Sequence, residues 1–169
     1  MPDANERLLR RRAERLAIPE QSTAVDPTAL TVVEFLLDDE HYAIELRHIR
    51  EIVPFRELTP VPGVQEAILG VVNLRGEIVA LLDLRRLFAL SPQAADAESR
   101  LIVLRSAEME MALLADQVVG VRVVTLHNTL NTLPTLSGYR QDYLLAITPE
   151  RMTILDGGKI LSDPRLVVG

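Results

Sequence analysis

The chain of 169 residues contains no cysteine, no tryptophan and no long apolar run. The lack of cysteine excludes a disulfide framework, a thiolate metal site and a thiol nucleophile, and it suits a reducing compartment. No stretch approaches the roughly 20 apolar residues of a membrane-spanning helix. Charged residues stand where a signal peptide would have its apolar run, so we predict a cytoplasmic protein.

Aromatic residues are scarce, with three Phe and three Tyr. Proteins that bind sugars or single-stranded nucleic acid stack their ligands on aromatic side chains, so this composition disfavours both classes. The formal net charge of −6 also disfavours binding to nucleic-acid phosphates. Hydrophobic residues make up 48% of the chain, which is enough to build a substantial core.

Residues able to carry out catalysis or bind metal show no pattern typical of a site. His41, His48 and His127 lack metal-ligand spacing, and the chain has no G-x-S-x-G motif or phosphate-binding glycine loop. Asp83 and Asp156 could be read as the paired carboxylates of a glycosidase, or as helix N-caps. Their matching positions in two repeats favour caps. The sequence therefore predicts no enzyme, no cofactor and no metal.

Residues 1–28 differ in composition from the rest of the chain. Asn5–Ala17 has apolar residues on one helical face and arginines on the other, and Glu20–Thr28 has the composition of a linker. We interpret the arginine face as solvated. The alternative is a docking element for an acidic partner or an anionic membrane surface. Residues 29–169 are expected to form one domain.

Within residues 29–169 the apolar residues follow a β pattern. Two hairpins are predicted, the first with a polar turn and the second with an Arg75-Gly76 turn. Their strands are expected at Val32–Leu37, Tyr42–Leu46, Ile68–Leu74 and Ile78–Leu82.

The β pattern repeats along the chain. The segment from Tyr42 to Ile52 is matched by the segment from Met111 to Val121, and Ile78–Asp83 is matched by Arg151–Asp156. We interpret this as two related β units of about 70 residues each. Two nearly closed small barrels that share an interface would fit the pattern and hide the strand edges.

The segment from Asn73 to Leu84 reads N-L-R-G, an apolar strand and then D-L, and it resembles the signature of the CheW family of chemotaxis coupling proteins. Two further segments are similar to the same family in order and spacing. The first runs from Phe35 through Tyr42-Ala-Ile to Ile52, and the second is Thr59-Pro-Val-Pro-Gly63 followed by Ile68-Leu-Gly-Val71. The resemblance covers roughly residues 30–165. In the second unit, Thr148-Pro149-Glu150 replaces the N-L-R-G turn.

This resemblance implies an all-β fold. Two SH3-like five-stranded β-barrel subdomains would share a hydrophobic interface, with short helices and an N-terminal helix.

The resemblance also implies a non-catalytic adaptor that couples chemoreceptors to a CheA-type histidine kinase. The implied partners are the regulatory domain of the kinase and the cytoplasmic tip of methyl-accepting chemoreceptors, with no nucleic acid and no membrane insertion. The protein would then be recruited to receptor clusters at the inner face of the membrane. An accessory scaffold in a surface-motility, pilus or second-messenger pathway is the alternative.

The resemblance identifies Arg75, Glu51, Ile49, Asn73 and Gly76 as candidate partner-binding residues. The planar guanidinium of Arg75 suits bidentate bonding to a carboxylate across an interface, and the alternative is a local surface salt bridge. Ile49 and Glu51 could form an apolar anchor with a polar rim. The alternative for this pair is an ordinary half-buried strand, with Ile49 inside and Glu51 outside.

Overall fold

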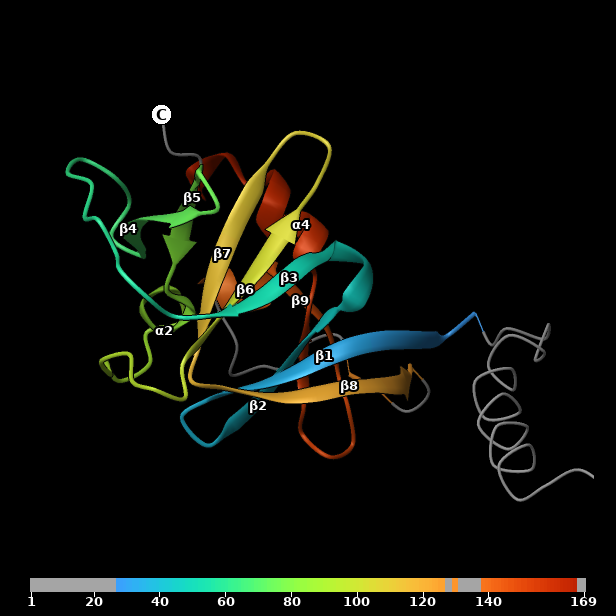
Figure 1. Cartoon of the computed structure of the whole chain (residues 1–169). Coiled ribbons are helices and arrows are strands. Elements are labelled where there is room, and N and C mark those ends of the chain that lie inside the picture. The colour runs from blue at the N-terminus through green and yellow to red at the C-terminus, as the bar shows by residue number, and fades with distance from the viewer. Residues whose placement is uncertain (1–26, 127–128, 131–137, 167–169) are drawn as a thin grey trace, which may run out of the picture.

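The computed structural model describes residues 27–126, 129–130 and 138–166. These residues form ten strands in two five-stranded sheets, with short helices between strands (Figure 1). The all-β architecture with two five-stranded units is therefore confirmed. The helix predicted over Asn5–Ala17 lies outside the described residues.

Each sheet is named here for its place in the chain. The terminal sheet has the order β8-β1-β2-β10-β9 and uses both ends of the described chain. Its strands are β1 (Ala29–Leu37), β2 (Glu40–Glu45), β8 (Gln117–Thr125), β9 (Leu144–Ile147) and β10 (Thr153–Leu155). The central sheet has the order β3-β6-β7-β5-β4. Its strands are β3 (Ile49–Pro54), β4 (Ile68–Leu74), β5 (Glu77–Leu82), β6 (Arg100–Arg105) and β7 (Glu110–Ala115).

Short helical segments connect or follow the strands. They are η1 (Leu46–His48), α2 (Leu84–Leu87), α3 (Gly138–Asp142), α4 (Gly157–Ser162) and η2 (Pro164–Leu166).

The two sheets have the same connectivity, but they do not coincide with the two halves of the chain. In each sheet a central antiparallel hairpin, β1–β2 or β6–β7, is joined by a parallel strand, β10 or β5. The first two strands of one repeat unit form the hairpin, and the last three strands of the other unit complete the sheet: β8 pairs with β1, and β3 pairs with β6. Each sheet is therefore built from strands of both repeat units.

The third strands of the two repeat units, β3 and β8, share a β-bulge. The register shift between Ile49 and Glu51 leaves Arg50 as the extra residue of β3, and the shift opposite Glu34/Phe35 leaves Val119 as the extra residue of β8. Arg50 and Val119 occupy matching positions of the sequence repeat, in which Tyr42 corresponds to Met111. A bulge bends its strand and redirects side chains. Since β3 and β8 share the bulge at matching positions, they are structural counterparts in their bend as well as in their pairing.

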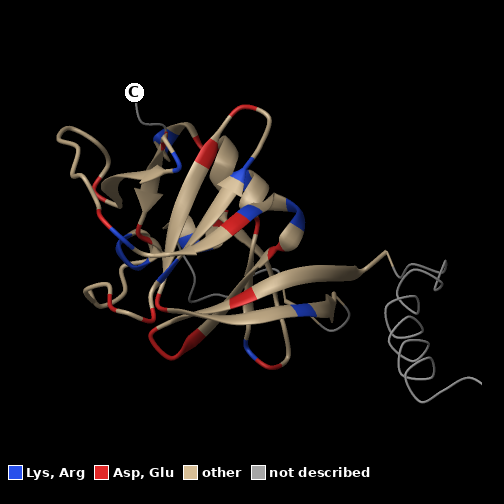
Figure 2. Ribbon diagram, viewed as in Figure 1, with Lys and Arg blue, Asp and Glu red and all other residues tan. Residues whose placement is uncertain are grey.

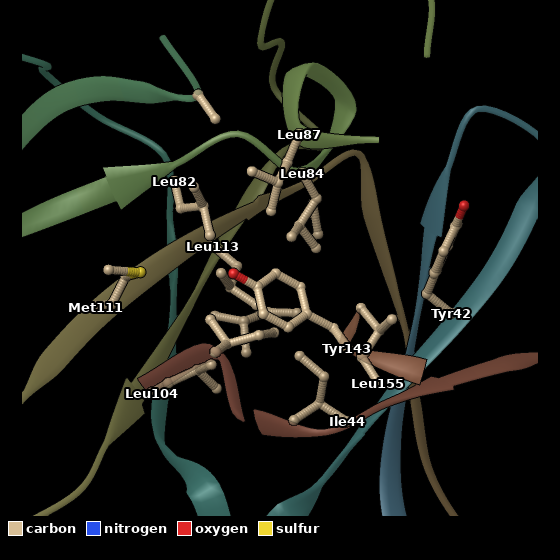
Figure 3. Close-up of a cluster of buried hydrophobic side chains, with 14 of the residues drawn as sticks. Tyr42, Ile44, Leu82, Leu84, Leu87, Leu104, Met111, Leu113, Tyr143 and Leu155 are labelled. Atoms are coloured by element: carbon tan, nitrogen blue, oxygen red, sulfur yellow. The ribbon is translucent and has the colours of Figure 1, made fainter. Parts of the chain in front are cut away.

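Apolar side chains form one cluster between the sheets and one within each sheet. Figure 3 shows the cluster between the sheets, where side chains such as Ile44, Leu104 and Tyr143 from distant segments meet. Alternate residues of the same strands face the other two clusters, because successive side chains of a strand point to opposite sides. Leu101 and Val103 belong to the cluster of the central sheet. On β2, Ile44 belongs to the cluster between the sheets and Ala43 to the cluster of the terminal sheet. The predicted hydrophobic interface shared by the two units is this first cluster.

Asp83 and Asp156 are both helix caps, as predicted. The Oδ1 atom of Asp83 accepts a hydrogen bond from the Arg85 backbone N–H at 3.0 Å. The Oδ1 atom of Asp156 accepts one from the Lys159 N–H at 3.1 Å. Burial raises the pKa of Asp83, but this carboxylate is engaged with the first turn of α2.

Arg85 joins both sheets through a buried guanidinium whose side chain is 2% exposed. Its Nη1 donates to Asp38 Oδ1 at 2.6 Å, in the β1–β2 turn, and to the Ser91 carbonyl at 2.9 Å. Its Nη2 donates to Gln93 Oε1 at 2.8 Å, and its Nε and Nη2 both bond to Asp116, where the chain crosses from β7 to β8. A planar group with five N–H donors is thus satisfied on every side.

Replacing Arg85 with Met should therefore destabilise the fold strongly, because it leaves two clustered carboxylates without their cation. We expect a loss of about 3 to 5 kcal/mol in the free energy of unfolding. Arg86→Met is the matched control, since its side chain is 48% exposed and lies 3.7 Å from Asp83. We expect Arg86→Met to cost no more than about 1 kcal/mol. Urea denaturation of both variants measures this, and equal costs would contradict the role given to Arg85.

The edge strand β4 is covered by the loop that precedes it. Thr59 and Val71 exchange two backbone hydrogen bonds, of 2.9 and 2.8 Å. This close approach requires glycine at position 70, where φ is +151° and an added Cβ would lie 2.2 Å from the Thr59 carbonyl oxygen. The loop and Gly70 together hide a backbone edge that would otherwise be open.

Gly70→Ala is expected to destabilise the protein by about 3 kcal/mol or more, since backbone strain and a backbone clash act together. Gly63→Ala is the control, because Gly63 also has a positive φ (+76°) but has no atom within 4 Å of an added Cβ. Its expected cost is about 1 kcal/mol, from backbone strain alone. Thermal and urea unfolding of the two variants would disprove the clash if their costs were the same.

Candidate partner-binding site

The tip of the β4–β5 hairpin is a two-residue turn built by the sequence Asn73-Leu-Arg-Gly76. Arg75 and Gly76 both have positive φ, +54° and +89°, which is the conformation of a type I′ turn. The Asn73 Oδ1 atom accepts a hydrogen bond from the Gly76 N–H at 2.8 Å. Asn73 and Gly76 therefore shape the turn, and Arg75 is the residue that the turn presents.

Arg75 and Glu51, two of the candidate residues, lie together. The Arg75 side chain is 78% exposed, and its Nη2 lies 3.2 Å from Oε2 of Glu51 on β3. The Glu51 side chain is only 16% exposed. The local salt bridge considered as the alternative for Arg75 is thus present, and it connects the hairpin tip to β3.

Arg50 neighbours the candidate residue Glu51, and the sequence analysis did not identify it. The bulge of β3 directs it to two acids of other strands, with Nη1 2.6 Å from Glu77 Oε2 and 2.9 Å from Glu110 Oε2. The hydrogen bond to Glu77 raises the pKa of Arg50, and the same bond lowers the pKa of Glu77. Both groups are therefore charged at neutral pH. Charged residues gather at the start of β3 and in the turn before it (Figure 2).

Ile49 lies apart from the Arg75–Glu51 pair. Its side chain is partly buried and packs against the cluster between the sheets. Ile52, further along β3, is the more exposed apolar residue, with 37% of its surface accessible. The bulge at Arg50 separates these positions, so strict alternation along β3 does not describe which residues face outward.

A groove of about 800 Å³ runs between β3 and β4, which are the two edges of the central sheet. Apolar side chains, among them Val53, Val72 and Leu101, lie along it, and charged residues of both signs stand beside them. Its lining is Glu51, Val53, Pro54, Arg56, Glu57, Val72, Asn73, Leu74, Arg75 and Leu101. An apolar floor with a charged rim is the anatomy of a small protein-docking surface.

The described residues hold no group of three or more His, Asp or Glu able to bind a metal ion. None of the helices in this part of the chain is long and apolar enough to cross a membrane. His48 and His41 lie apart in the structure: His41 Nδ1 is 2.8 Å from Glu34 Oε1, and His48 packs against Gly157.

The fold and the groove together define a small β docking module, and comparison with known proteins shows its family. The CheW-like domain family matches residues 31–165. The chain is 30% identical over 107 residues to the chemotaxis protein CheW of Bacillus subtilis, covering 63% of this chain and 67% of that protein. It is 31% identical over 137 residues to CheW of Klebsiella aerogenes, covering 79% and 82%. The chain belongs to the CheW-like family.

A solved structure shows the same fold. The scaffolding protein TtCheW from Thermoanaerobacter tengcongensis superimposes with a TM-score of 0.67 at 23% identity, covering 78% of this chain and 86% of that structure. The family couples chemoreceptors to the kinase CheA in chemotaxis, and the function of this chain is that of such a signalling scaffold.

The Arg75–Glu51 ion pair should contribute little to stability, because one partner is largely in solvent. A double-mutant cycle with Arg75→Ala, Glu51→Gln and the double variant should give a coupling energy below about 1 kcal/mol by urea denaturation. A coupling above about 2 kcal/mol would instead identify the pair as part of the framework.

Proposed function

We propose that the hairpin tip, β3 and the groove between them form the surface through which this coupling protein binds the regulatory domain of its CheA-type kinase. The receptor contact would use Arg75 as well, with the cytoplasmic tip of a methyl-accepting chemoreceptor as the partner. The protein would act in the cytoplasm without catalysis and would be recruited to receptor clusters.

The observation that supports this proposal best is the conformation of Arg75. Non-glycine residues with positive φ are uncommon and carry a backbone cost, of the order of 1 kcal/mol or more. The fold accepts this cost for a side chain that is 78% exposed and whose ion pair is of the kind that stabilises little. The turn thus presents a guanidinium to solvent rather than burying it, which suits bidentate binding to a partner's carboxylate.

Glu51 and the groove extend the same surface. Glu51 holds the guanidinium over the rim, so fewer rotamers of the long Arg75 side chain have to be frozen when a partner binds. The apolar lining supplied by Val53, Leu74 and Leu101 offers the area that an anchoring side chain of the partner would cover. Asn73 and Gly76 contribute by shaping the turn, and Ile49 by fixing the start of β3.

Arg75→Ala should weaken binding of the kinase regulatory domain by about tenfold or more while leaving the melting temperature nearly unchanged. Arg86→Ala is the control, since it is an exposed arginine beside a single carboxylate on α2, away from the groove. Isothermal titration calorimetry with the co-encoded kinase domain, together with receptor-dependent kinase assays, measures the effect. Unchanged binding and coupling would refute the proposal, and a large fall in melting temperature would make Arg75 structural.

A further inference from the structure

Strand β8 presents an exposed row of valines at an edge of the terminal sheet. Val119, Val121 and Val123 are 51%, 61% and 65% exposed, and they alternate along the strand. We call these three residues the valine row. In Figure 2 the ribbon of β8 is free of charge over most of its length. Three exposed β-branched residues in line on an edge strand form an apolar surface that native proteins usually protect.

The other sheet edges in the described part of the chain are protected. The edge of β4 is paired with Thr59, and the edge of β9 is paired with Leu130 through two backbone hydrogen bonds of 3.0 and 2.6 Å. The edge of β3 carries Arg50 and Glu51 and ends in Pro54. At the counterpart of Arg50, β8 has Val119 instead, so the same bulge that presents charge on β3 presents an apolar side chain on β8.

The chain enters the fold beside this row. Ala29, the first residue of β1, pairs with Thr125 at the end of β8, and the Leu126 N–H donates to the Thr28 carbonyl at 2.8 Å. Residues 1–26 therefore join the fold next to the end of β8 at which Val123 lies. In strand geometry Val121 is about 13 Å from Thr125. A nine-residue linker such as Glu20–Thr28 spans up to about 30 Å, so the segment before it reaches the whole row.

The sequence of this segment complements the row. Leu9 and Leu16 fall on one face of the helix predicted over Asn5–Ala17, and Arg11 falls on the opposite face. The helix would be about 20 Å long, which matches the length of the row. Residues 1–26 contain five Arg and five acids, so their net charge of zero does not oppose contact with the rest of the chain, and the apolar face supplies the attraction.

We propose that residues 1–26 dock in cis on the valine row, with the leucine face of the N-terminal segment against Val119, Val121 and Val123. The segment then covers the unprotected edge of the terminal sheet and competes with any partner that uses the same strand. This inference goes beyond the proposed function of the groove, and its test needs neither kinase nor receptor.

The absence of native cysteine allows a direct test on the full chain. Leu9→Cys combined with Val121→Cys should form an intramolecular disulfide under mild oxidation at low protein concentration, because docking raises the effective concentration of the two thiols. Two control pairs measure the background: Arg11→Cys with Val121→Cys, from the opposite helix face, and Leu9→Cys with Ile78→Cys, at an equally exposed site of the central sheet. We expect at least about a fivefold higher yield for the first pair.

Mass mapping of a mixture of isotope-labelled and unlabelled chains separates bonds within one molecule from bonds between two. Adding Leu16→Asp should reduce the yield to that of the controls, whereas Glu14→Asp should leave it unchanged. Equal yields in all three pairs would show a tether without a docking site and would overturn the proposal. Bonds found only between labelled and unlabelled chains would overturn it in favour of a second copy on the valine row.

Discussion

The buried guanidinium of Arg85 is the contact on which the arrangement of the two sheets depends. It reaches the turn of the first hairpin at Asp38, the crossover between the sheets at Asp116 and the segment after α2 at Ser91 and Gln93. The crossover at Asp116 is the point at which the chain leaves β7 and begins β8. Holding this point against Asp38 determines where β8 starts along β1, and hence how the second repeat unit joins the terminal sheet.

The same framework determines where the groove between β3 and β4 lies. The central sheet begins and ends with β3 and β4, and the groove is the space between these two edges. One edge is stiffened by the Thr59–Val71 pairing and the other by the bonds of Arg50 to Glu77 and Glu110. Both strands that border the groove are therefore held by contacts within the fold.

What the sequence could predict depends on how far apart the interacting residues lie. The Arg75-Gly76 turn and the cap at Asp83 rest on contacts within three residues, so their residue types reveal them. The carboxylate partners of Arg85 lie 31 and 47 residues away, and those of Arg50 lie 27 and 60 residues away. No short window contains both members of such a pair. The repeat indicated two units, but the last three strands of each unit match those of the other and would fit either sheet equally well.

The two repeat units give the fold two equivalent edge strands, β3 and β8. β3 and β8 occupy equivalent edges and carry the bulge at equivalent positions, yet the residue at the bulge is Arg50 in one and Val119 in the other. A charged edge favours partners with complementary carboxylates and resists strand addition, whereas an apolar edge favours any segment able to cover it. A repeated framework thus allows the two edges to differ in chemistry without a change in backbone, because the bulge residues Arg50 and Val119 lie outside the apolar clusters.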